Sequence, residues 1–277
     1  MMRKIWSGIF RHIIIRLGIS TKEIMCIFVV NEEKIPKEDE LVNYLLSEFN
    51  KLKSEYKIKT IVKNINNKNT NVILGNTNKT IYGDGYIYDK LGDNIFKISP
   101  MSFYQTNPIQ TEVLYNKAIE YAKLKKDDIL LDLYCGIGTI GIYASKFVNR
   151  VYGIEIVEQA IVDANENAKI NQINNIEFKC GDVEKVLDDL LQEKQIKPNV
   201  IMVDPPRRGL DMYTIETILN VEPERLVYIS CNPATMVRDL NKFEEKYSIK
   251  EIQPVDMFPF TSHVECVSVL HRKHFEK

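Results

Sequence analysis

Five short apolar segments in the second half of this chain each end in polar or glycine-rich residues, and helical stretches separate them. The segments cover residues 128–134, 150–156, 176–181, 199–205 and 225–230. This alternation predicts parallel βαβ units, in which all strands end at the same edge of one sheet. Two further apolar segments, 249–258 and 264–272, are joined by a short loop around Pro259, so we expect them to pair antiparallel. The predicted fold is therefore α/β, a parallel sheet closed by an antiparallel terminal hairpin.

The first hundred residues show a different pattern, with mixed α and β signals. Short β-rich runs at 12–18 and 23–30 precede a helical pattern at 38–56, where apolar residues recur at spacings of three and four. Further strands are predicted at 58–65 and 71–75, and residues 75–85 are rich in turn formers. We therefore predict two domains, a smaller α+β domain at 1–98 and the α/β domain at 99–277.

The composition is that of a soluble globular protein, with 44% hydrophobic and 27% charged residues. No run approaches the ~20 apolar residues of a membrane span. The five scattered cysteines form no CxxC pair and the four histidines form no ligand cluster. We therefore expect a cytoplasmic protein with no membrane partner and no protein-built metal site. Although the net charge is only −1, residues 1–100 carry +5 and residues 101–277 carry −6. Either the first part faces an anion, or its lysines are simply solvated.

The first parallel strand runs into a glycine-rich turn. Gly136, Gly138 and Gly141 match the pattern G-x-G-x-x-G, which is weak alone and is usually quoted for dinucleotide binding. Its physical content is broader, because glycines let the backbone approach a ligand at a helix N-terminus. Asp132, a charge in an otherwise apolar strand, needs partners, and the backbone N–H groups of the turn are suitable.

The next three strand ends carry acidic residues. Glu155, 19 residues past Gly136, is placed to accept both ribose hydroxyls of an adenosine cofactor. Asp182 is placed for the adenine amino group, and the Asp-Pro-Pro corner that begins at Asp204 aims a carboxylate into the crevice. This corner does not belong to the dinucleotide pattern. We therefore expect S-adenosylmethionine rather than NAD, on a Rossmann-like class I SAM-dependent methyltransferase sheet. If these glycines and acids were only turn residues, their occurrence at four strand ends would be a coincidence.

The fifth strand breaks at Ser230, Cys231, Asn232 and Pro233. A single cysteine at a strand end is often an inert core thiol. The four preceding strand ends favour the other interpretation, in which the break exposes the sulfur of Cys231 at the ligand crevice as a nucleophile.

These features together resemble the RNA 5-methyluridine (uracil-C5) methyltransferases, and the resemblance covers nearly all of residues 98–277 in the family's order. The matching segments are ISPMSFYQTNPIQTEVLY (98–115), LDLYCGIGTIGIYAS (131–145), VYGIEIVEQAIVDANENAKIN (151–171), VDPPRRGLD (203–211), YISCNPATMVRDL (228–240) and VDMFPFTSHVECVSVLHR (255–272). Near the start, GIFRHIIIRLG and NTNVILGN resemble the family's central, RNA-facing domain.

The resemblance implies roles position by position. Cys231 matches the catalytic nucleophile, and Glu265 matches the base that removes the C5 proton of uracil. Gln105 matches the residue that contacts the cofactor or the flipped base near the domain junction, and we count it with both the catalytic and the cofactor residues. Asp204 is counted with both sets as well. The remaining predicted cofactor contacts are Tyr134, Gly136, Thr139, Glu155 and Asp182.

The chemistry of uracil explains why such residues are needed. Carbon 5 is a poor nucleophile, and a thiolate that adds to carbon 6 pushes electron density onto it. A carboxylate is then a suitable base for the C5 proton. The base cannot react while stacked in a helix, so it must be flipped out or lie in a loop. Arg207, Arg208 and Arg238, near these loops, are predicted RNA-phosphate contacts.

The chain departs from the family at its start. Many members begin with a β-barrel RNA-binding domain and carry a cysteine cluster for an iron–sulfur centre. This chain starts beyond both, natively or by truncation, so we expect no iron–sulfur cluster here. We expect a monomer that acts on RNA, namely 23S rRNA, because RHIIIRLG and DLYCGIGTIG resemble those members more closely. The alternative substrate is tRNA.

Two other functions remain open at this point. Asp-Pro-Pro resembles the Asn-Pro-Pro corner of amino-group methyltransferases, but that class needs no nucleophilic cysteine and usually has an aromatic residue where Arg207 stands. The other alternative is an inactive RNA-binding remnant, against which the intact Cys231, Glu265, Asp204 and Gln105 argue.

Overall fold

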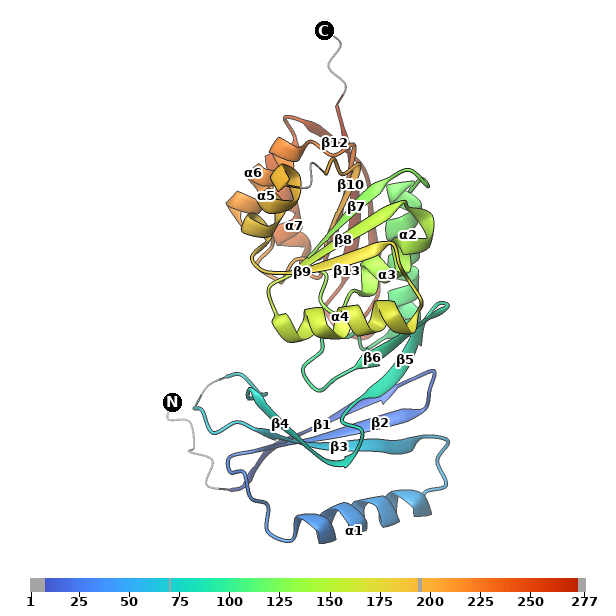
Figure 1. Cartoon of the computed structure of the whole chain (residues 1–277), viewed down its shortest axis with the longest axis vertical. Helices are drawn as coiled ribbons and strands as arrows, with labels where there is room; N and C mark the ends of the chain where they lie inside the picture. Colours follow the sequence, from blue (N-terminus) through green and yellow to red (C-terminus); the bar gives the residue numbers. More distant parts are fainter. Residues whose placement is uncertain (1–7, 70, 194–195, 274–277) are drawn as a thin grey trace. The chain divides into compact units, whose positions relative to one another are not determined.

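The computed structural model describes residues 8–69, 71–193 and 196–273 (Figure 1). The chain divides into two compact units. The first comprises the residues up to Lys90 together with Ile95–Ser102, and the second comprises Leu91–Asn94 together with the residues from Phe103 onward. The roles that the sequence predicts for residues 1–98 and 99–277 stay predictions.

The first unit is an α+β arrangement around a four-stranded sheet in the order β1-β2-β3-β4. Its elements are β1 (Phe10–Gly18), β2 (Glu23–Val30), α1 (Glu38–Lys51), β3 (Lys57–Ile65) and β4 (Thr77–Gly83). Only β2 and β3 pair in parallel, with α1 as the connection between them. The apolar side chains of α1, β2 and β3 form one hydrophobic core.

Two sequence expectations for this unit were wrong. Residues 71–75 form no strand, and β4 lies instead within the predicted turn-rich loop. Side chains on β3 and just after it bind the backbone before β4: the Asn66 amide donates to the carbonyls of Val72 and Ile73, at 2.8 and 2.9 Å, and Asn64 bonds Gly75. The strand therefore begins only at Thr77, where the chain meets the free edge of β3.

A two-stranded hairpin, β5 (Ile87–Leu91) and β6 (Asn94–Ile98), was not predicted from the sequence. Its turn, Leu91–Asn94, belongs to the second compact unit. In that unit a Cβ on Gly92 would lie 3.0 Å from the ring of Tyr143, so the turn packs closely against α3 (Thr139–Ala144).

The second unit contains a seven-stranded sheet in the order β12-β13-β11-β10-β7-β8-β9, and it confirms the predicted α/β fold. Five strands are parallel: β7 (Ile129–Leu133), β8 (Arg150–Glu155), β9 (Ile176–Cys180), β10 (Val200–Val203) and β11 (Arg225–Ser230). The predicted antiparallel hairpin consists of β12 (Tyr247–Val255) and β13 (Glu265–Arg272). Because β13 lies between β11 and β12, it alone runs against the rest of the sheet.

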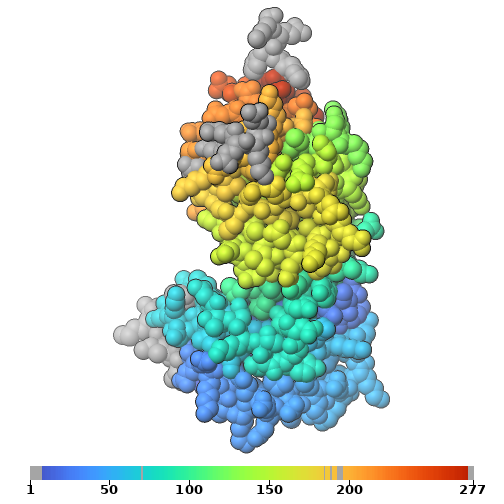
Figure 2. All heavy atoms as spheres, in the orientation of Figure 1, coloured from blue at the N-terminus to red at the C-terminus, as the bar shows by residue number. Residues whose placement is uncertain are grey.

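Helices cover both faces of this sheet (Figure 1). One face carries α2 (Pro108–Ala122), α3 and α4 (Glu158–Ile170), and the other carries α5 (Val183–Glu193), α6 (Met212–Val221) and α7 (Pro233–Phe243). In the space-filling view, α4, in yellow-green, and β9, in yellow, form much of the visible surface of this unit (Figure 2). None of the helices in the described part of the chain has the length and apolar character that a membrane crossing requires.

Candidate active site

The glycine-rich turn after β7 needs its glycines. Gly136 and Gly138 have positive φ values, 55° and 81°, where L side chains are rare. A Cβ on Gly138 would lie 2.5 Å from the ring of Phe178, so this position packs tightly. A Cβ on Gly136 would meet nothing within 4 Å, so the backbone there borders open space. The neighbouring Tyr134 also has a positive φ, 65°, and its hydroxyl lies 3.3 Å from that of Thr214.

Asp132, on β7, hydrogen-bonds the start of the helix that follows this turn. It is fully buried, and Oδ2 accepts a hydrogen bond of 2.8 Å from the N–H of Gly141, as the sequence predicts. Oδ1 is buried without a hydrogen-bond partner among the described residues. Burial, with a smaller contribution from Glu155, raises the pKa of Asp132 to about 7.

Glu155 ends β8 beside the same turn. Its carboxylate accepts hydrogen bonds from the N–H of Gly136, at 3.2 Å, and of Val157, at 3.0 Å. A carboxylate offers about four acceptor positions, so ribose hydroxyls can still bind here. Asp182, which follows β9, is exposed, and Gly181 just before it donates to the backbone of Glu155. The ends of β8 and β9 are therefore adjacent.

Thr139 begins α3 and contacts a residue that the sequence analysis missed. Its hydroxyl lies 2.9 Å from that of Tyr115, a buried side chain of α2. The carboxylates of Asp204 and Asp132 both act on the Tyr115 hydroxyl and, with burial as the main cause, raise its pKa. Tyr115 thus lies beside the two acids. No motif indicated it, because its role depends on which face of α2 meets the sheet.

Asp204 follows β10 at the centre of the strand-end edge. Its N–H donates to the carbonyl of Leu133 on the neighbouring strand, at 3.4 Å, and its side chain is partly buried. Burial, then the charges of Glu265 and Asp132, raise the pKa of Asp204 to about 8. Three carboxylates from three strands therefore share this edge.

Cys231 and Glu265 adjoin the last pair of the antiparallel β11–β13 ladder. In that register Ser230 pairs with Cys266, Cys231 directly follows Ser230, and Glu265 directly precedes Cys266. Glu265 is only 3% exposed, and burial raises its pKa, whereas Arg207 acts in the opposite direction. The sequence prediction that these residues lie close together, although 34 positions separate them, holds in the fold.

The Cys231 thiol is partly exposed, and its surroundings work against ionisation. Burial raises its pKa first, and the negative charges of Glu265 and Asp204 raise it further. Arg207 opposes them and lowers the pKa through its positive charge. Four predicted residues, Cys231, Glu265, Asp204 and Arg207, therefore form one electrostatic group.

Gln105 lies in the segment that leads into α2 and is partly buried. Two residues later, Asn107 caps α2 by accepting from the N–H of Gln110 and donates to the carbonyl of Met257, at 3.1 Å. The Gln105 segment therefore runs beside the loop between β12 and β13, which leads to Glu265.

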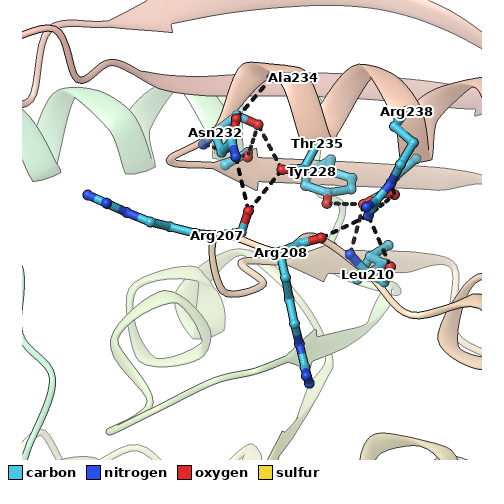
Figure 3. A network of polar contacts seen from close by, with 10 residues as sticks. Arg207, Arg208, Leu210, Tyr228, Asn232, Ala234, Thr235 and Arg238 are labelled. Atoms are coloured by element: carbon cyan, nitrogen blue, oxygen red, sulfur yellow. Dashed lines mark hydrogen bonds and ion pairs between the residues drawn. The ribbon is translucent and has the colours of Figure 1, made fainter. Parts of the chain in front are cut away.

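The three predicted RNA-contacting arginines differ in their surroundings (Figure 3). The side chains of Arg207 and Arg208 extend away from α7. The guanidinium of Arg238 instead donates to Asp239, at 2.7 and 2.8 Å, and to the carbonyl of Arg208, at 2.8 Å. Within the described residues, histidine, cysteine and acidic side chains form no group of three that could hold a metal.

The comparison with protein families decides what this site belongs to. A family model described as tRNA (Uracil-5-)-methyltransferase matches residues 41–273. The chain belongs to the tRNA (uracil-5-)-methyltransferase family.

Curated relatives of this family are similar over most of the chain. A protein of Oceanobacillus iheyensis is 48% identical over 267 residues, and one of Staphylococcus aureus is 50% identical over 269. Both are described as uncharacterized RNA methyltransferases. Each alignment covers 96% of this chain but only 57% of the relative, so the chain spans just over half of their length.

Solved structures agree with the uracil-5-methyltransferase fold. The tRNA (uracil-54, C5)-methyltransferase of Pyrococcus abyssi, in complex with S-adenosyl-L-homocysteine, matches with a TM-score of 0.77 and 32% identity, over 95% of this chain and 60% of that one. The tRNA m1G37 methyltransferase of M. jannaschii matches with a TM-score of 0.59 and 14% identity, which supports the fold alone.

The residues present fit the S-adenosyl cofactor of this family. Open space borders Gly136, where the backbone conformation favours glycine, and the acceptor Glu155 lies beside it. These are the features that an adenosine with two ribose hydroxyls requires. Residues 130–155 thus supply a cradle for the nucleoside.

Proposed function

We propose that this chain methylates C5 of uracil in RNA with S-adenosylmethionine, through a covalent bond between Cys231 and C6 of the base. The observation that carries the proposal is the register of β11 and β13, which sets Cys231 beside the buried carboxylate of Glu265. Asp204 lies at the same edge, beside the glycine-rich turn of the cofactor cradle. Nucleophile, base and cofactor site therefore adjoin one another.

The first step is addition of Cys231 to C6. Its thiolate forms the S–C6 bond, and the electron pair of the C5–C6 double bond moves to C5 and the adjoining carbonyl. Since carboxylates raise the pKa of this thiol, Arg207 is the group that favours the thiolate. S-adenosylmethionine, which Gly136, Thr139, Glu155 and Asp182 would hold, would supply the methyl group. C5 takes the methyl carbon as the bond from that carbon to sulfur breaks, and S-adenosylhomocysteine is the leaving group.

The second task is removal of the C5 proton. Burial raises the pKa of Glu265, which makes its carboxylate a stronger base than an exposed one. As Glu265 takes the proton, the C5–C6 double bond re-forms and the S–C6 bond breaks, which releases the thiolate of Cys231. Asp204, with its pKa of about 8, holds a proton near neutral pH and is able to donate it to an oxygen of the base.

The proposed substrate is 23S rRNA, supported by the resemblance of the segments at 11–18 and 132–141 to those members. The tRNA alternative is supported by the family description and by the Pyrococcus abyssi relative, which acts on a tRNA uracil. In either case we propose that residues 1–98 face the RNA and that Gln105 contacts the cofactor or flipped base. Arg207 and Arg208, which are exposed and extend away from α7, are proposed phosphate contacts (Figure 3).

We further propose a monomer that acts in the cytoplasm. Five free cysteines are suited to a reducing compartment. An amino-group methyltransferase is disfavoured by the pairing of Cys231 with Glu265, for which that chemistry has no use.

The experiment that tests the proposal is nucleoside mass spectrometry of rRNA and tRNA from cells with and without the gene. We expect 5-methyluridine at one position to disappear on deletion and to return with the wild-type gene but not with Cys231→Ala. Unchanged 5-methyluridine in both RNAs would refute the activity. Loss in tRNA alone would reassign the substrate.

A further inference from the structure

A buried carboxylate on α7, Asp239, binds the loop that follows β10 (Figure 3). The side chain is 1% exposed. Its Oδ2 accepts hydrogen bonds from the N–H of Leu210, at 2.8 Å, and from the hydroxyl of Tyr228 on β11, at 2.7 Å. One oxygen thus joins three elements: the loop, the strand that precedes Cys231 and the helix that follows it.

The other oxygen is held by Arg238. Oδ1 accepts from Nε and Nη2 of that guanidinium, at 2.8 and 2.7 Å. The same Nη2 also donates to the carbonyls of Arg208, at 2.8 Å, and Leu210, at 3.4 Å. A buried carboxylate is costly unless it is paired and hydrogen-bonded, and Asp239 has four donors.

The first turn of α7 binds the same loop one residue earlier. The Asn232 amide and the Thr235 hydroxyl donate to the carbonyl of Arg207, at 3.1 and 3.2 Å. Gly209, with φ of 78°, lies so close that a Cβ would be 2.4 Å from Oδ2 of Asp239. The loop is therefore bound to α7 along residues 207–210.

This attachment determines where the Arg207 side chain starts. The carbonyl of Arg207 accepts a hydrogen bond from the amide of Asn232, the N-cap of α7, which directly follows Cys231. The positive charge of Arg207 lowers the pKa of the Cys231 thiol. A displacement of residues 207–210 from α7 would therefore change the relation between the guanidinium and the sulfur, while leaving the glycine-rich turn after β7 untouched.

We propose that Asp239, together with Arg238, is a positioning residue that holds the loop carrying Arg207 beside Cys231. The inference rests on the proposed covalent function and assigns Arg238 to the loop rather than to an RNA phosphate. Asp239 touches neither base nor cofactor in this account. It acts by keeping the loop that carries Arg207 and the helix that follows Cys231 in one rigid arrangement.

The test uses Arg238→Ala and Asp239→Asn, with Arg150→Ala as the matched control. Arg150 also binds a carbonyl and a carboxylate, those of Asn174 and Glu177, but at the opposite end of β8. The Arg238 side chain is 54% exposed, so its removal should leave the chain folded even if Asp239→Asn does not fold. Folding is checked by circular dichroism, and S-adenosylhomocysteine affinity by calorimetry.

The decisive measurement is the pH profile of iodoacetamide alkylation at Cys231, followed on its peptide by mass spectrometry. The exposed Cys180 serves as the internal reference. We expect both variants to shift the Cys231 midpoint upward by about half a pH unit, which lowers its alkylation rate about threefold below the midpoint. Cofactor affinity, the Cys180 profile and the Arg150→Ala control should not change.

A wild-type pH profile of Cys231 alkylation in folded Arg238→Ala would overturn the positioning role. A loss of S-adenosylhomocysteine affinity as large as the loss of alkylation rate would also overturn it. Arg238→Lys should show a smaller shift than Arg238→Ala, because one ammonium group can reach one of the acceptors. If the shift appears but deletion of the gene leaves 5-methyluridine unchanged, the proposed function fails and the role at the thiol stands. The two hypotheses are thereby separable.

Discussion

Cys231 is surrounded by groups that do not favour a thiolate. Burial, then the charges of Glu265 and Asp204, raise its pKa, whereas the charge of Arg207 lowers it. The same carboxylates are needed for later steps of the proposed reaction. The site therefore holds its nucleophile protonated near neutral pH and depends on Arg207 to offset the acids.

At this scale we predict that Arg207→Gln raises the pKa of Cys231 further. The positive charge that lowers the pKa is lost, while both carboxylates remain. The midpoint of Cys231 alkylation should move to higher pH, and methyl transfer should fall most strongly at neutral pH and partly recover at alkaline pH. A profile unchanged from the wild type would contradict the role of this guanidinium.

A second prediction concerns the stability cost of Asp204. Its pKa is raised from 3.8 to about 8 in the folded chain, so folding favours the protonated form. The contribution of Asp204 to folding stability is fully present below its unfolded pKa and is lost as the pH rises through about 8. Asp204→Asn does not titrate. The Tm of Asp204→Asn minus that of the wild type should therefore increase between about pH 5 and pH 9, although methyl transfer is lost.

The control for this prediction is a variant away from the acidic edge, such as Arg150→Ala, whose Tm difference should not depend on pH over that range. A constant Tm difference for Asp204→Asn would show that the carboxylate is not forced toward its protonated form.

The sequence predicts the residues at strand ends well and those on helices poorly. Asp132, Glu155, Asp204 and Cys231 all lie at or next to the carboxyl ends of apolar strands, and parallel pairing necessarily brings such ends to one edge. Tyr115 and Asp239 gave no comparable signal, because their contacts depend on the rotation of α2 and α7 over the sheet.

At the level of elements, the position of β13 is what brings Glu265 to Cys231. The sequence indicates that β12 and β13 pair, but two apolar runs do not determine which of them lies against β11. The insertion of β13 between β11 and β12 settles this. The failed prediction around residues 71–83 has a similar cause, since Asn64 and Asn66 hold the backbone there by side-chain bonds.

The start of α7 gives a prediction at this scale. Asn232 caps the helix by accepting from the N–H of Ala234 and also donates to the carbonyl of Arg207. Asn232→Ala should lower the free energy of unfolding by about 1 kcal/mol, the usual effect of a lost N-cap. Urea denaturation measures it. A change below about 0.3 kcal/mol would contradict the capping role.

For the whole molecule, the second compact unit contains all of the predicted catalytic and cofactor residues, from Gln105 to Glu265. The first unit contributes the basic part of the sequence. This separation of chemistry from charge could be predicted from the composition and motif positions. The hairpin of β5 and β6, whose turn belongs to the second unit, could not be predicted. Its residues show no clear alternation of apolar and polar side chains.

Cofactor binding should stabilise this molecule by a calculable amount. At a ligand concentration of about 100 times Kd, S-adenosylhomocysteine should add about 2.7 kcal/mol to the free energy of unfolding. Glu155→Ala should weaken binding and reduce the stabilisation at the same concentration, because the ribose acceptor is gone. Thermal shift titration measures both, and an undiminished shift would rule out the ribose contact.

The central claim is the covalent bond between Cys231 and the uracil ring, and a trapped adduct tests it most directly. RNA carrying 5-fluorouridine cannot lose a proton from C5 after methylation, so the S–C6 bond should persist. We predict a protein–RNA species stable in denaturant, with the nucleotide mapped by mass spectrometry to the peptide that contains Cys231 and absent in Cys231→Ala. Methyl transfer to natural RNA by Cys231→Ala, or an adduct on another residue, would contradict the account.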